Sequence, residues 1–337
     1  MTVSAMAALL PALGLSWWST RSVVRFLRAR AVLDIPNERS SHSRPTPRGG
    51  GLAFGAVILG GILVAAAAGW VRSAVALALV PSGGAIALVG WIDDRRGLPA
   101  RFRLLVHVAA AVWVVYCFGP ADRLELGRLS LPLGPAAAIV SVLGLVWLSN
   151  LFNFMDGIDG IAASEAASVA IIAASLCLRA GDTEPAWLFL LVAAAVLGFL
   201  PWNWAPARVF MGDSGSVVLG FLLGALALLE NQRTVIPALG SALLLGVFLV
   251  DATLTLIRRA ARGERLSVAH RSHAYQRAVQ AGASHARVSR AVVGLNLVLG
   301  SLVWAGVTWP ERTPELYAAG LILLLGVYLL VERLRPM

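Results

Sequence analysis

Long apolar runs are the feature that most constrains this 337-residue chain. Crossing about 30 Å of hydrocarbon takes roughly 20 apolar residues, because each helical residue rises about 1.5 Å. Runs of this length recur eleven times, near residues 4–24, 49–69, 73–92, 103–119, 135–153, 160–178, 186–202, 214–229, 235–257, 288–308 and 314–334. The composition, 58% apolar and 14% charged, lies outside the range of soluble domains. The sequence therefore predicts one all-α polytopic membrane domain over residues 1–337, with about 11 transmembrane helices.

The distribution of basic residues predicts the orientation in the membrane. All 28 basic residues are arginines, and arginine-rich loops stay on the cytoplasmic side. If the N-terminus lies outside, the arginine-rich segments all fall on one side. The first apolar run lacks a small-residue cleavage site and precedes its arginines, which favours an anchor over a removed signal. We therefore expect cytoplasmic loops near residues 25–48, 93–102, 154–159, 203–213 and 258–287.

The net charge of +10 favours anionic partners. The arginines flank apolar runs without interleaved aromatic residues, so we expect membrane lipids and phosphorylated substrates rather than nucleic acid. Cys117 and Cys177 lie within apolar runs and predict neither a disulfide nor a zinc site. The alternating pattern of residues 120–134 predicts a small external β-hairpin.

Acidic and amide side chains gather in three short islands between the apolar runs. The islands are Asp93 and Asp94, then Asn150, Asn153, Asp156 and Asp159, then Asp213 within residues 210–216. Two adjacent carboxylates are poorly ionised at low dielectric without a cation, and a buried acid needs a partner or a metal. Taken alone, Asp93 and Asp94 could equally cap a membrane helix. Together the islands predict a divalent cation with phosphate ligands on one face.

The second and third islands suit a nucleotide sugar. Polar groups recur every third residue up to a glycine-broken helix end, where backbone can approach a ligand. Amides can bind a nucleobase or a sugar, and carboxylates a metal or a hydroxyl group. Asp213 starts a helix whose free N–H groups can bind phosphate. Phe210 could stack on a base or pack as an ordinary apolar residue, and the sequence leaves both readings open.

A fourth polar cluster follows Asp251 in the last long loop. His270, Arg271 and His273 can supply hydrogen bonds and positive charge to a diphosphate or a sugar, as can Arg277. The alternative is a basic amphipathic helix on the lipid surface. Asp251 lies near the end of an apolar run, so it requires a partner or a ligand.

In these motifs the chain resembles the polyprenyl-phosphate N-acetylhexosamine-1-phosphate transferases, particularly the O-antigen-initiating branch. The resemblance runs in order through Asp34 to Asn37, Pro45 to Gly51, Asp93-Asp94, Asn150 to Gly160, Gly212 to Ser216 and Asp251. It implies ten or eleven helices in the bacterial inner membrane. It also implies transfer of a phospho-sugar from a UDP-N-acetylhexosamine to undecaprenyl phosphate with Mg²⁺, or with Mn²⁺ in its place, and release of UMP. The sugar and the oligomeric state, with a homodimer as one alternative, stay open.

The resemblance also implies roles for single residues. The candidate catalytic residues are Asp93, Asp94, Asp156, Asp159, Asp213 and His273; the candidate substrate-binding residues are Asn150, Asn153, Phe210, Arg103, His270 and Arg271; and the candidate metal ligands are Asp213 and Asp156. Phe210 would contact the uracil, and Asp93 and Asp94 would lie near the lipid phosphate. Arg103 and His107 stand where the family has a lysine and a glutamine. We therefore expect Arg103 to occupy the same position as the lysine without making an identical contact.

Three alternatives accompany this interpretation. A transporter or flippase would also have many spans with polar islands, but these islands cluster at one face without repeat symmetry. A transferase of CDP-activated substrates is the second alternative. The third concerns mechanism: direct displacement by the lipid phosphate, with Asp93 as an orienting group or weak base, competes with a covalent phospho-aspartate route.

Overall fold

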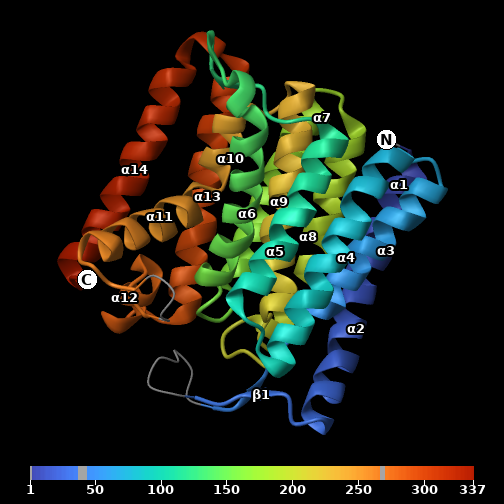
Figure 1. Cartoon of the computed structure of the whole chain (residues 1–337), viewed down its shortest axis with the longest axis vertical. Helices are drawn as coiled ribbons and strands as arrows, with labels where there is room; N and C mark the ends of the chain where they lie inside the picture. Colours follow the sequence, from blue (N-terminus) through green and yellow to red (C-terminus); the bar gives the residue numbers. More distant parts are fainter. Residues whose placement is uncertain (1, 37–43, 266–269) are drawn as a thin grey trace.

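Membrane-length helices packed side by side make up most of the computed structural model, which describes residues 2–36, 44–265 and 270–337 (Figure 1). The helices are α1 (Val3–Ala7), α2 (Leu9–Ala29), α3 (Gly51–Ala67), α4 (Ser73–Arg96), α5 (Ala100–Phe118), α6 (Ala137–Met155), α7 (Ile161–Arg179), α8 (Thr183–Asn203), α9 (Asp213–Arg233), α10 (Ala238–Leu244), α11 (Gly246–Ala261), α12 (Ala274–Gln280), α13 (His285–Thr308) and α14 (Thr313–Leu334). Two short 3₁₀ helices, η1 (Gly134–Ala136) and η2 (Pro310–Arg312), precede α6 and α14. The fold class predicted from the sequence is confirmed.

The expected count of eleven spans is not confirmed, although every predicted apolar run is helical. Within the described ranges, nine helices are long and apolar enough to cross a membrane. Helix α3 has only 17 residues, and the ninth predicted run is divided into α10 and α11, which meet at 83°. Counting that bent pair as one span gives ten. In Figure 1, α11 accordingly lies across the direction of its neighbours.

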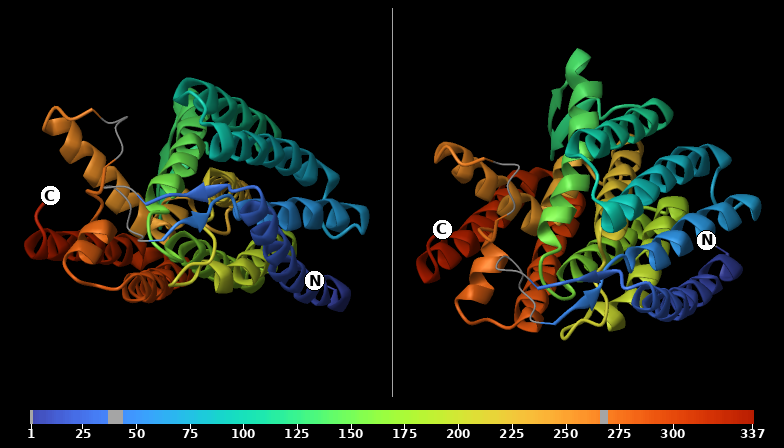
Figure 2. Two further views of the ribbon diagram at one scale, coloured as in Figure 1. Left: turned by 90° about the horizontal axis from the view of Figure 1, so that it is seen from below. Right: turned by 60° about the horizontal axis from the view of Figure 1, so that its bottom comes forward.

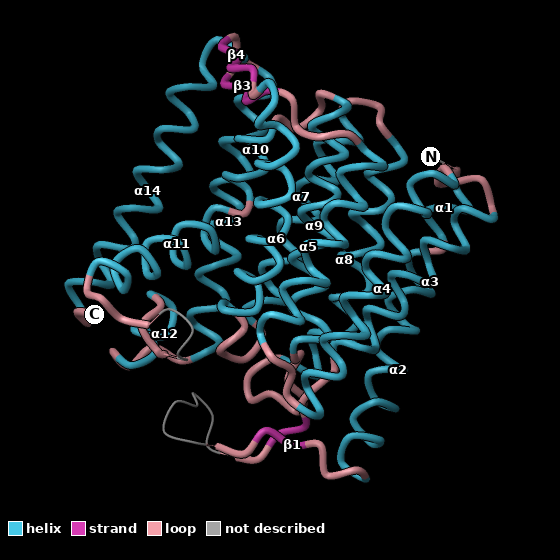
Figure 3. The backbone as a smooth tube through the Cα atoms, in the orientation of Figure 1, coloured by secondary structure: helices cyan, strands magenta, loops and turns pink. Residues whose placement is uncertain are grey.

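Two small antiparallel sheets mark the opposite ends of the bundle (Figure 3). Strand β3 (Arg123–Leu126) pairs with β4 (Leu129–Pro132), which confirms the hairpin predicted between residues 120 and 134. At the other end, β1 (Leu33–Asp34) pairs with β2 (Thr46–Pro47), a pairing that the sequence did not predict. Seen from below, this second sheet crosses the end of the bundle (Figure 2). Residue 37 of the Asp34-to-Asn37 motif lies outside the described residues.

Helix α9 is the central helix of the bundle. In its apolar window 94% of residues are buried, compared with 22% in the window of α14. Its glycines allow close packing, because a Cβ on Gly220 would lie 2.3 Å from the carbonyl oxygen of Leu148 in α6. The first turn of α9 lies at the same end as β1 and β2, where α4 and α6 end and α5 begins. This end is called the site end below.

Glycines also bring α3 and α4 against the first turn of α9. A Cβ on Gly51 of α3 would lie 2.2 Å from the Cα of Gly215. A Cβ on Gly90 of α4 would lie 2.7 Å from the backbone nitrogen of Ser214 and from the carbonyl carbon of Asp213. Backbone therefore meets backbone at both contacts, and the residues that follow Gly90 reach the start of α9.

We expect Gly90→Ala to destabilise the protein by about 1 to 3 kcal/mol, because the new methyl group would push α4 away from α9. Gly84 of the same helix is the matched control, since nothing lies within 4 Å of an added Cβ there. Gly84→Ala should be neutral or stabilise by up to about 1 kcal/mol through helix propensity. Thermal unfolding midpoints of the purified variants test this, and equal midpoints would contradict the close packing of α4 on α9.

Candidate active site at the start of the central helix

Asp94 caps the start of α9 from a neighbouring helix. The N-cap residue of α9 is Gly212, which has no side chain to satisfy the free N–H groups of the first turn. The Asp94 carboxylate accepts hydrogen bonds from the backbone N–H groups of Asp213 and Ser214, at 2.9 and 3.1 Å, and from the Ser214 hydroxyl at 2.8 Å. Its side chain is fully buried. The capping alternative considered for this acid is therefore realised, across helices and in contact with the site.

Asp213 is held by two arginines and an amide. Arg48 and Arg103 donate to it at 2.7 and 2.8 Å, and Asn153 at 2.9 Å. Arg103 also donates to Asp93 at 2.6 Å, and Arg48 to Asp94 at 2.9 Å. These hydrogen bonds bring together α4, α5, α6, α9 and the segment after β2. The convergence of the three acid islands at one place is thus observed for these residues.

Arg48 is placed by an exchange of backbone hydrogen bonds. The Phe210 N–H donates to the carbonyl of Pro47 at 2.8 Å, and the Gly50 N–H donates to the carbonyl of Phe210 at 2.9 Å. A Cβ on Gly50 would lie 2.7 Å from the Val209 side chain, so this close approach requires glycine. Burial alone would lower the pKa of Arg48, but Asp213 and Asp94 raise it above its ordinary value. Arg48 therefore stays charged.

Asp156 differs from the other acids because no described group donates a hydrogen bond to its carboxylate. Burial raises its pKa well above the usual range; Arg48 lowers the pKa, and the charges of Asp213, Asp94 and Asp159 raise it. An acid in this state is destabilised in its ionised form. It is also the carboxylate most available to a cation or to a substrate hydroxyl group.

Asp159 lies at the junction of three loops rather than on Asp213. Its carboxylate accepts a hydrogen bond from the backbone N–H of Ala207 at 3.1 Å and lies 3.4 Å from Nδ1 of His285 in α13. The Ser289 hydroxyl donates to its carbonyl at 3.0 Å. Among the described contacts, Asp159 thus fixes the 156–160 turn, and it acts on Asp156 through its charge.

The cluster after Asp251 packs against the same turn. The Tyr275 hydroxyl donates to the carbonyl of Phe154 at 3.0 Å, and a Cβ on Gly157 would lie 2.1 Å from that hydroxyl oxygen. The rings of Phe154 and His273 are stacked with centroids 6.5 Å apart. Burial, followed by Asp251 and Asp156, raises the pKa of Tyr275 well above its usual value. The last cluster and the second island are therefore neighbours.

Asp251 has the partner that its position required. It accepts hydrogen bonds from the backbone N–H groups of Ala274 and Tyr275, at 2.7 and 3.0 Å, and lies 3.4 Å from Nδ1 of His273. Helix α12 is therefore capped by an acid from α11. His270 lies beside His273 with ring centroids 4.9 Å apart, and burial lowers the pKa of His270 to about 4. At neutral pH His270 is uncharged and offers only hydrogen bonds.

The remaining candidates lie at the margin of the cluster. The Asn150 amide donates to the Val146 carbonyl one turn back in α6, at 2.7 Å, which leaves its oxygen available. Phe210 is half-buried and anchored by its backbone beside Arg48. Arg271 is exposed next to His270. Their assigned substrate contacts stay predictions.

Sequence reasoning missed four residues that the structure places in this network: Arg48, Ser214, Tyr275 and His285. Only Arg48 carried a usable signal, because it stands directly before three glycines at the start of an apolar run. A charge beside a close backbone approach is typical of a ligand site. The others gain their roles from tertiary contacts alone.

The predicted Mg²⁺ ion would need phosphate oxygens to complete its ligands. No group of three or more His, Cys, Asp or Glu side chains in the described ranges is arranged to hold a metal. Mg²⁺ in phosphate-handling sites, however, takes one or two carboxylates together with phosphates and water. Asp156 and Asp213 could provide this pair, since the charge of Asp213 reaches Asp156. The metal assignment stays a prediction.

Membrane-length helices with acids and arginines converging at one end define a multi-pass membrane protein with a charged cluster at that end. The family model described as glycosyl transferase family 4 matches residues 75–231, which include Asp93, Asp94, Asn153, Asp156 and Asp213. The sequence is 32% identical to a probable undecaprenyl-phosphate N-acetylglucosaminyl 1-phosphate transferase of Bacillus subtilis, over 78% of this chain and 74% of the relative.

Two further relatives cover more of the chain. Identity is 33% to a decaprenyl-phosphate N-acetylglucosaminephosphotransferase of Mycobacterium tuberculosis, over 93% of this chain and 85% of the relative. Identity is also 33% to a phospho-N-acetylmuramoyl-pentapeptide-transferase of a Synechococcus strain, over 85% of this chain and 87% of the relative. The chain belongs to glycosyl transferase family 4, and the resemblance noted in its motifs is confirmed.

We expect two isosteric substitutions in this site to shift thermal stability in opposite directions. Asp94→Asn removes the charge that pairs with Arg48 and should destabilise by about 3 kcal/mol, as for other broken buried pairs. Asp156→Asn should stabilise the substrate-free protein by a few degrees at pH 7. Because the pKa of Asp156 is raised on folding, its ionised form opposes folding above the unfolded-state pKa.

The measurement is the unfolding midpoint of each variant between pH 5 and 8. The wild-type protein should lose stability relative to Asp156→Asn as pH rises towards the raised pKa of Asp156. A destabilised Asp156→Asn variant at every pH would contradict the account of this carboxylate.

Proposed function

We propose that this protein transfers an N-acetylhexosamine-1-phosphate from a UDP-sugar to undecaprenyl phosphate, giving the undecaprenyl-diphosphate-sugar and UMP. We further propose that the site end faces the cytoplasm and that the product starts an O-antigen-like surface polysaccharide. The observation that carries the proposal is the convergence of Asp93, Asp213, Arg48 and Arg103 at the start of α9. The names of the relatives, which act on polyprenyl phosphates, support it.

The exposure of the charged groups supports a diphosphate ligand. The side chains of Arg48 and Arg103 are 39% and 32% exposed, whereas those of Asp93, Asp94 and Asp213 are at most 10% exposed. The guanidinium groups therefore form the accessible surface of the cluster. Planar guanidinium donors bind phosphate oxygens in pairs, so both arginines can contact the diphosphate of a nucleotide sugar.

The charge balance supports the need for a cation. Asp93, Asp94 and Asp213 outnumber the two arginines that pair with them even without Asp156, so a cation would offset negative charge when an anionic substrate binds. Bound Mg²⁺ would neutralise phosphate charge and polarise the phosphoryl group under attack. Asp156 and Asp213 would hold it. Asp213 becomes available as Arg48 and Arg103 turn towards substrate phosphates.

The roles of the chain's own residues follow from these contacts. The lipid phosphate is largely dianionic at neutral pH, because the second pKa of a phosphate monoester is about 6. Its oxygen attacks the β-phosphorus of the UDP-sugar in line, and the bond to the bridging oxygen breaks so that UMP leaves. A strong general base is unnecessary. Asp93 would orient the attacking phosphate through Arg103, which it contacts at 2.6 Å.

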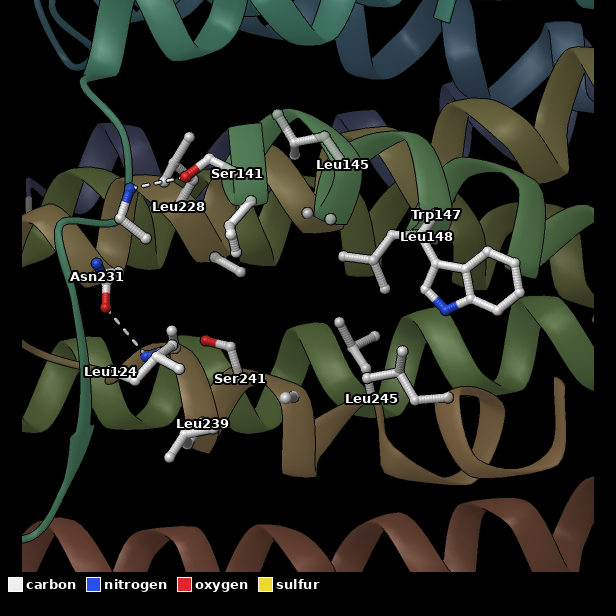
Figure 4. A pocket seen from close by; sticks show the side chains of 18 of the residues that line it. Leu124, Ser141, Leu145, Trp147, Leu148, Leu228, Asn231, Leu239, Ser241 and Leu245 are labelled. Atoms are coloured by element: carbon white, nitrogen blue, oxygen red, sulfur yellow. Dashed lines mark hydrogen bonds between the residues drawn. The ribbon is translucent and has the colours of Figure 1, made fainter. Parts of the chain in front are cut away.

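A cavity in the bundle supports a lipid substrate. It measures about 280 Å³ and lies between α6, α9 and the bent pair α10 and α11 (Figure 4). Its lining includes Leu145 and Leu148 of α6, Leu228 of α9, and Leu239 and Leu245 at the bend. The lining also includes Ser241, Ser141, which accepts a hydrogen bond from the Ala121 N–H, and Asn231, which accepts one from the Ala238 N–H. Such an apolar space can accommodate part of a polyprenyl chain.

The arrangement does not favour the transporter alternative. Transport sites lie near the membrane midplane on broken helices. Here the charged cluster lies at the site end, and the bent pair α10 and α11 borders an apolar cavity. A competition experiment distinguishes the proposed function from a transferase of CDP-activated substrates. Uridine nucleosides should inhibit turnover of the UDP-sugar, and cytidine should not.

We expect Asp213→Asn to reduce UMP release by about 100-fold or more, since it removes the carboxylate that positions Arg48, Arg103 and the cation. The assay contains the purified protein, Mg²⁺, undecaprenyl phosphate and a panel of UDP-sugars. Asp122→Asn is the control, because Asp122 is exposed at the opposite end and pairs with Arg123. Loss of activity in both variants, or UMP release with none of the sugars, would contradict the proposed function.

Direct displacement makes a separate prediction for a single turnover. Without undecaprenyl phosphate the nucleophile is missing, so wild-type protein mixed with Mg²⁺ and a UDP-sugar should release no UMP. A rapid-quench measurement with enzyme in excess tests this. Release of one UMP per protein would establish a covalent intermediate instead.

A further inference from the structure

Arg277 of α12 is among the most deeply buried charged side chains of the described protein, with 2% of its side chain exposed. The sequence suggested that Arg277 supplies charge to a diphosphate, but its side chain is too deeply buried for that contact. Instead its Nη1 donates to the Glu332 carboxylate at 2.5 Å and to the Arg335 carbonyl at 2.9 Å. Its Nε donates to the Ser272 carbonyl at 3.1 Å. One guanidinium thus joins the end of α14 to the backbone between His270 and His273.

Glu332 is the centre of this contact. Besides Arg277, it accepts two hydrogen bonds from Arg258 of α11, at 2.6 and 2.7 Å. The guanidinium groups of Arg258 and Arg277 lie 5.8 and 5.3 Å from the centroid of the Tyr328 ring. An acid shared by two arginines over an aromatic ring forms a rigid charged contact. Helices α11, α12 and α14 are therefore held at one point.

A second contact reaches the other end of α12. The Tyr328 hydroxyl lies 3.4 Å from the Thr255 hydroxyl, which donates to Asp251 at 3.1 Å. Asp251 in turn caps α12 at Ala274 and Tyr275. The last turns of α14 thus support both ends of a seven-residue helix that would be unstable alone. That helix presses Tyr275 against the 154–157 turn, next to Asp156.

We infer that Glu332 is a positioning residue, which holds residues 270–276, termed the histidine segment, against the 154–157 turn of the site. Glu332 contacts none of the acids at the start of α9 in the described structure, so it acts through Arg277 and Arg258. The inference rests on the proposed function for its effect on turnover. The anchoring itself is independent of which reaction the site performs.

Hydrogen exchange and kinetics on the full-length protein in lipid nanodiscs test this inference. In Glu332→Gln, amides of residues 270–280 should exchange about tenfold faster, because the buried Arg277 loses its counter-charge. Peptides covering residues 88–98 and 209–216 should exchange as in the wild type. The kcat for UMP release should fall about tenfold, while the KM for the UDP-sugar should change less.

Two further variants separate positioning from general damage. Glu332→Asp keeps the charge and should restore most of the protection and the turnover. Glu315→Gln, at the exposed start of the same helix, should match the wild type in both measurements. Wild-type exchange in Glu332→Gln, or faster exchange with unchanged kcat, would overturn the inference. A wild-type protein that releases no UMP would refute the proposed function, whereas the exchange data would still decide the anchoring.

Discussion

The capping of α9 by Asp94 is the interaction on which the rest of the site depends. A helix buried at the centre of a membrane bundle cannot leave the N–H groups of its first turn without partners. Because the N-cap position is Gly212, the acceptor has to come from elsewhere, and α4 supplies it. A Cβ on Gly212 would lie 2.4 Å from that carboxylate, so the absent side chain is what admits Asp94. The hydrogen bonds that pair the first N–H groups of α9 are therefore also the contacts that bring Asp94 to Asp213.

The same contact sets the positions of the arginines. Asp94 accepts from Arg48, and Asp213, the next residue after the cap, accepts from both Arg48 and Arg103. Each acid that is buried at the start of α9 thus requires an arginine from another element, since an unpaired charge would be too costly there. The side chains of both arginines remain partly exposed while they donate hydrogen bonds to the buried carboxylates. A network that stabilises the fold thereby leaves two cationic groups partly exposed at the site end.

The sequence predicted where the acid islands lie better than it predicted the contacts of each residue within them. Runs of apolar residues located every membrane-length helix, and the acids at the ends of these runs predicted the convergence at the start of α9, because both signals are local. The sequence did not reveal that α10 and α11 form a bent pair, since an apolar run looks alike whether it is straight or broken. Nor did it reveal that Asp159 binds Ala207 and lies beside His285, or that Arg277 is buried against Glu332. Those roles depend on residues more than forty positions away.

Asp156 and Asp94 show why residue type alone does not define a catalytic acid. The Asp94 carboxylate accepts hydrogen bonds from the first turn of α9 and from Arg48, so its charge stabilises the start of the helix. Asp156, in contrast, has no hydrogen-bond donor among the described groups, and the charge of Arg48 acts on it without a hydrogen bond. An unsatisfied acid is costly to a fold, and one that lies among converging charges is a candidate for contact with a ligand. Hydrogen-bond partners therefore distinguish the acids that hold the fold together, such as Asp94, from the acid that is predicted to contact a ligand.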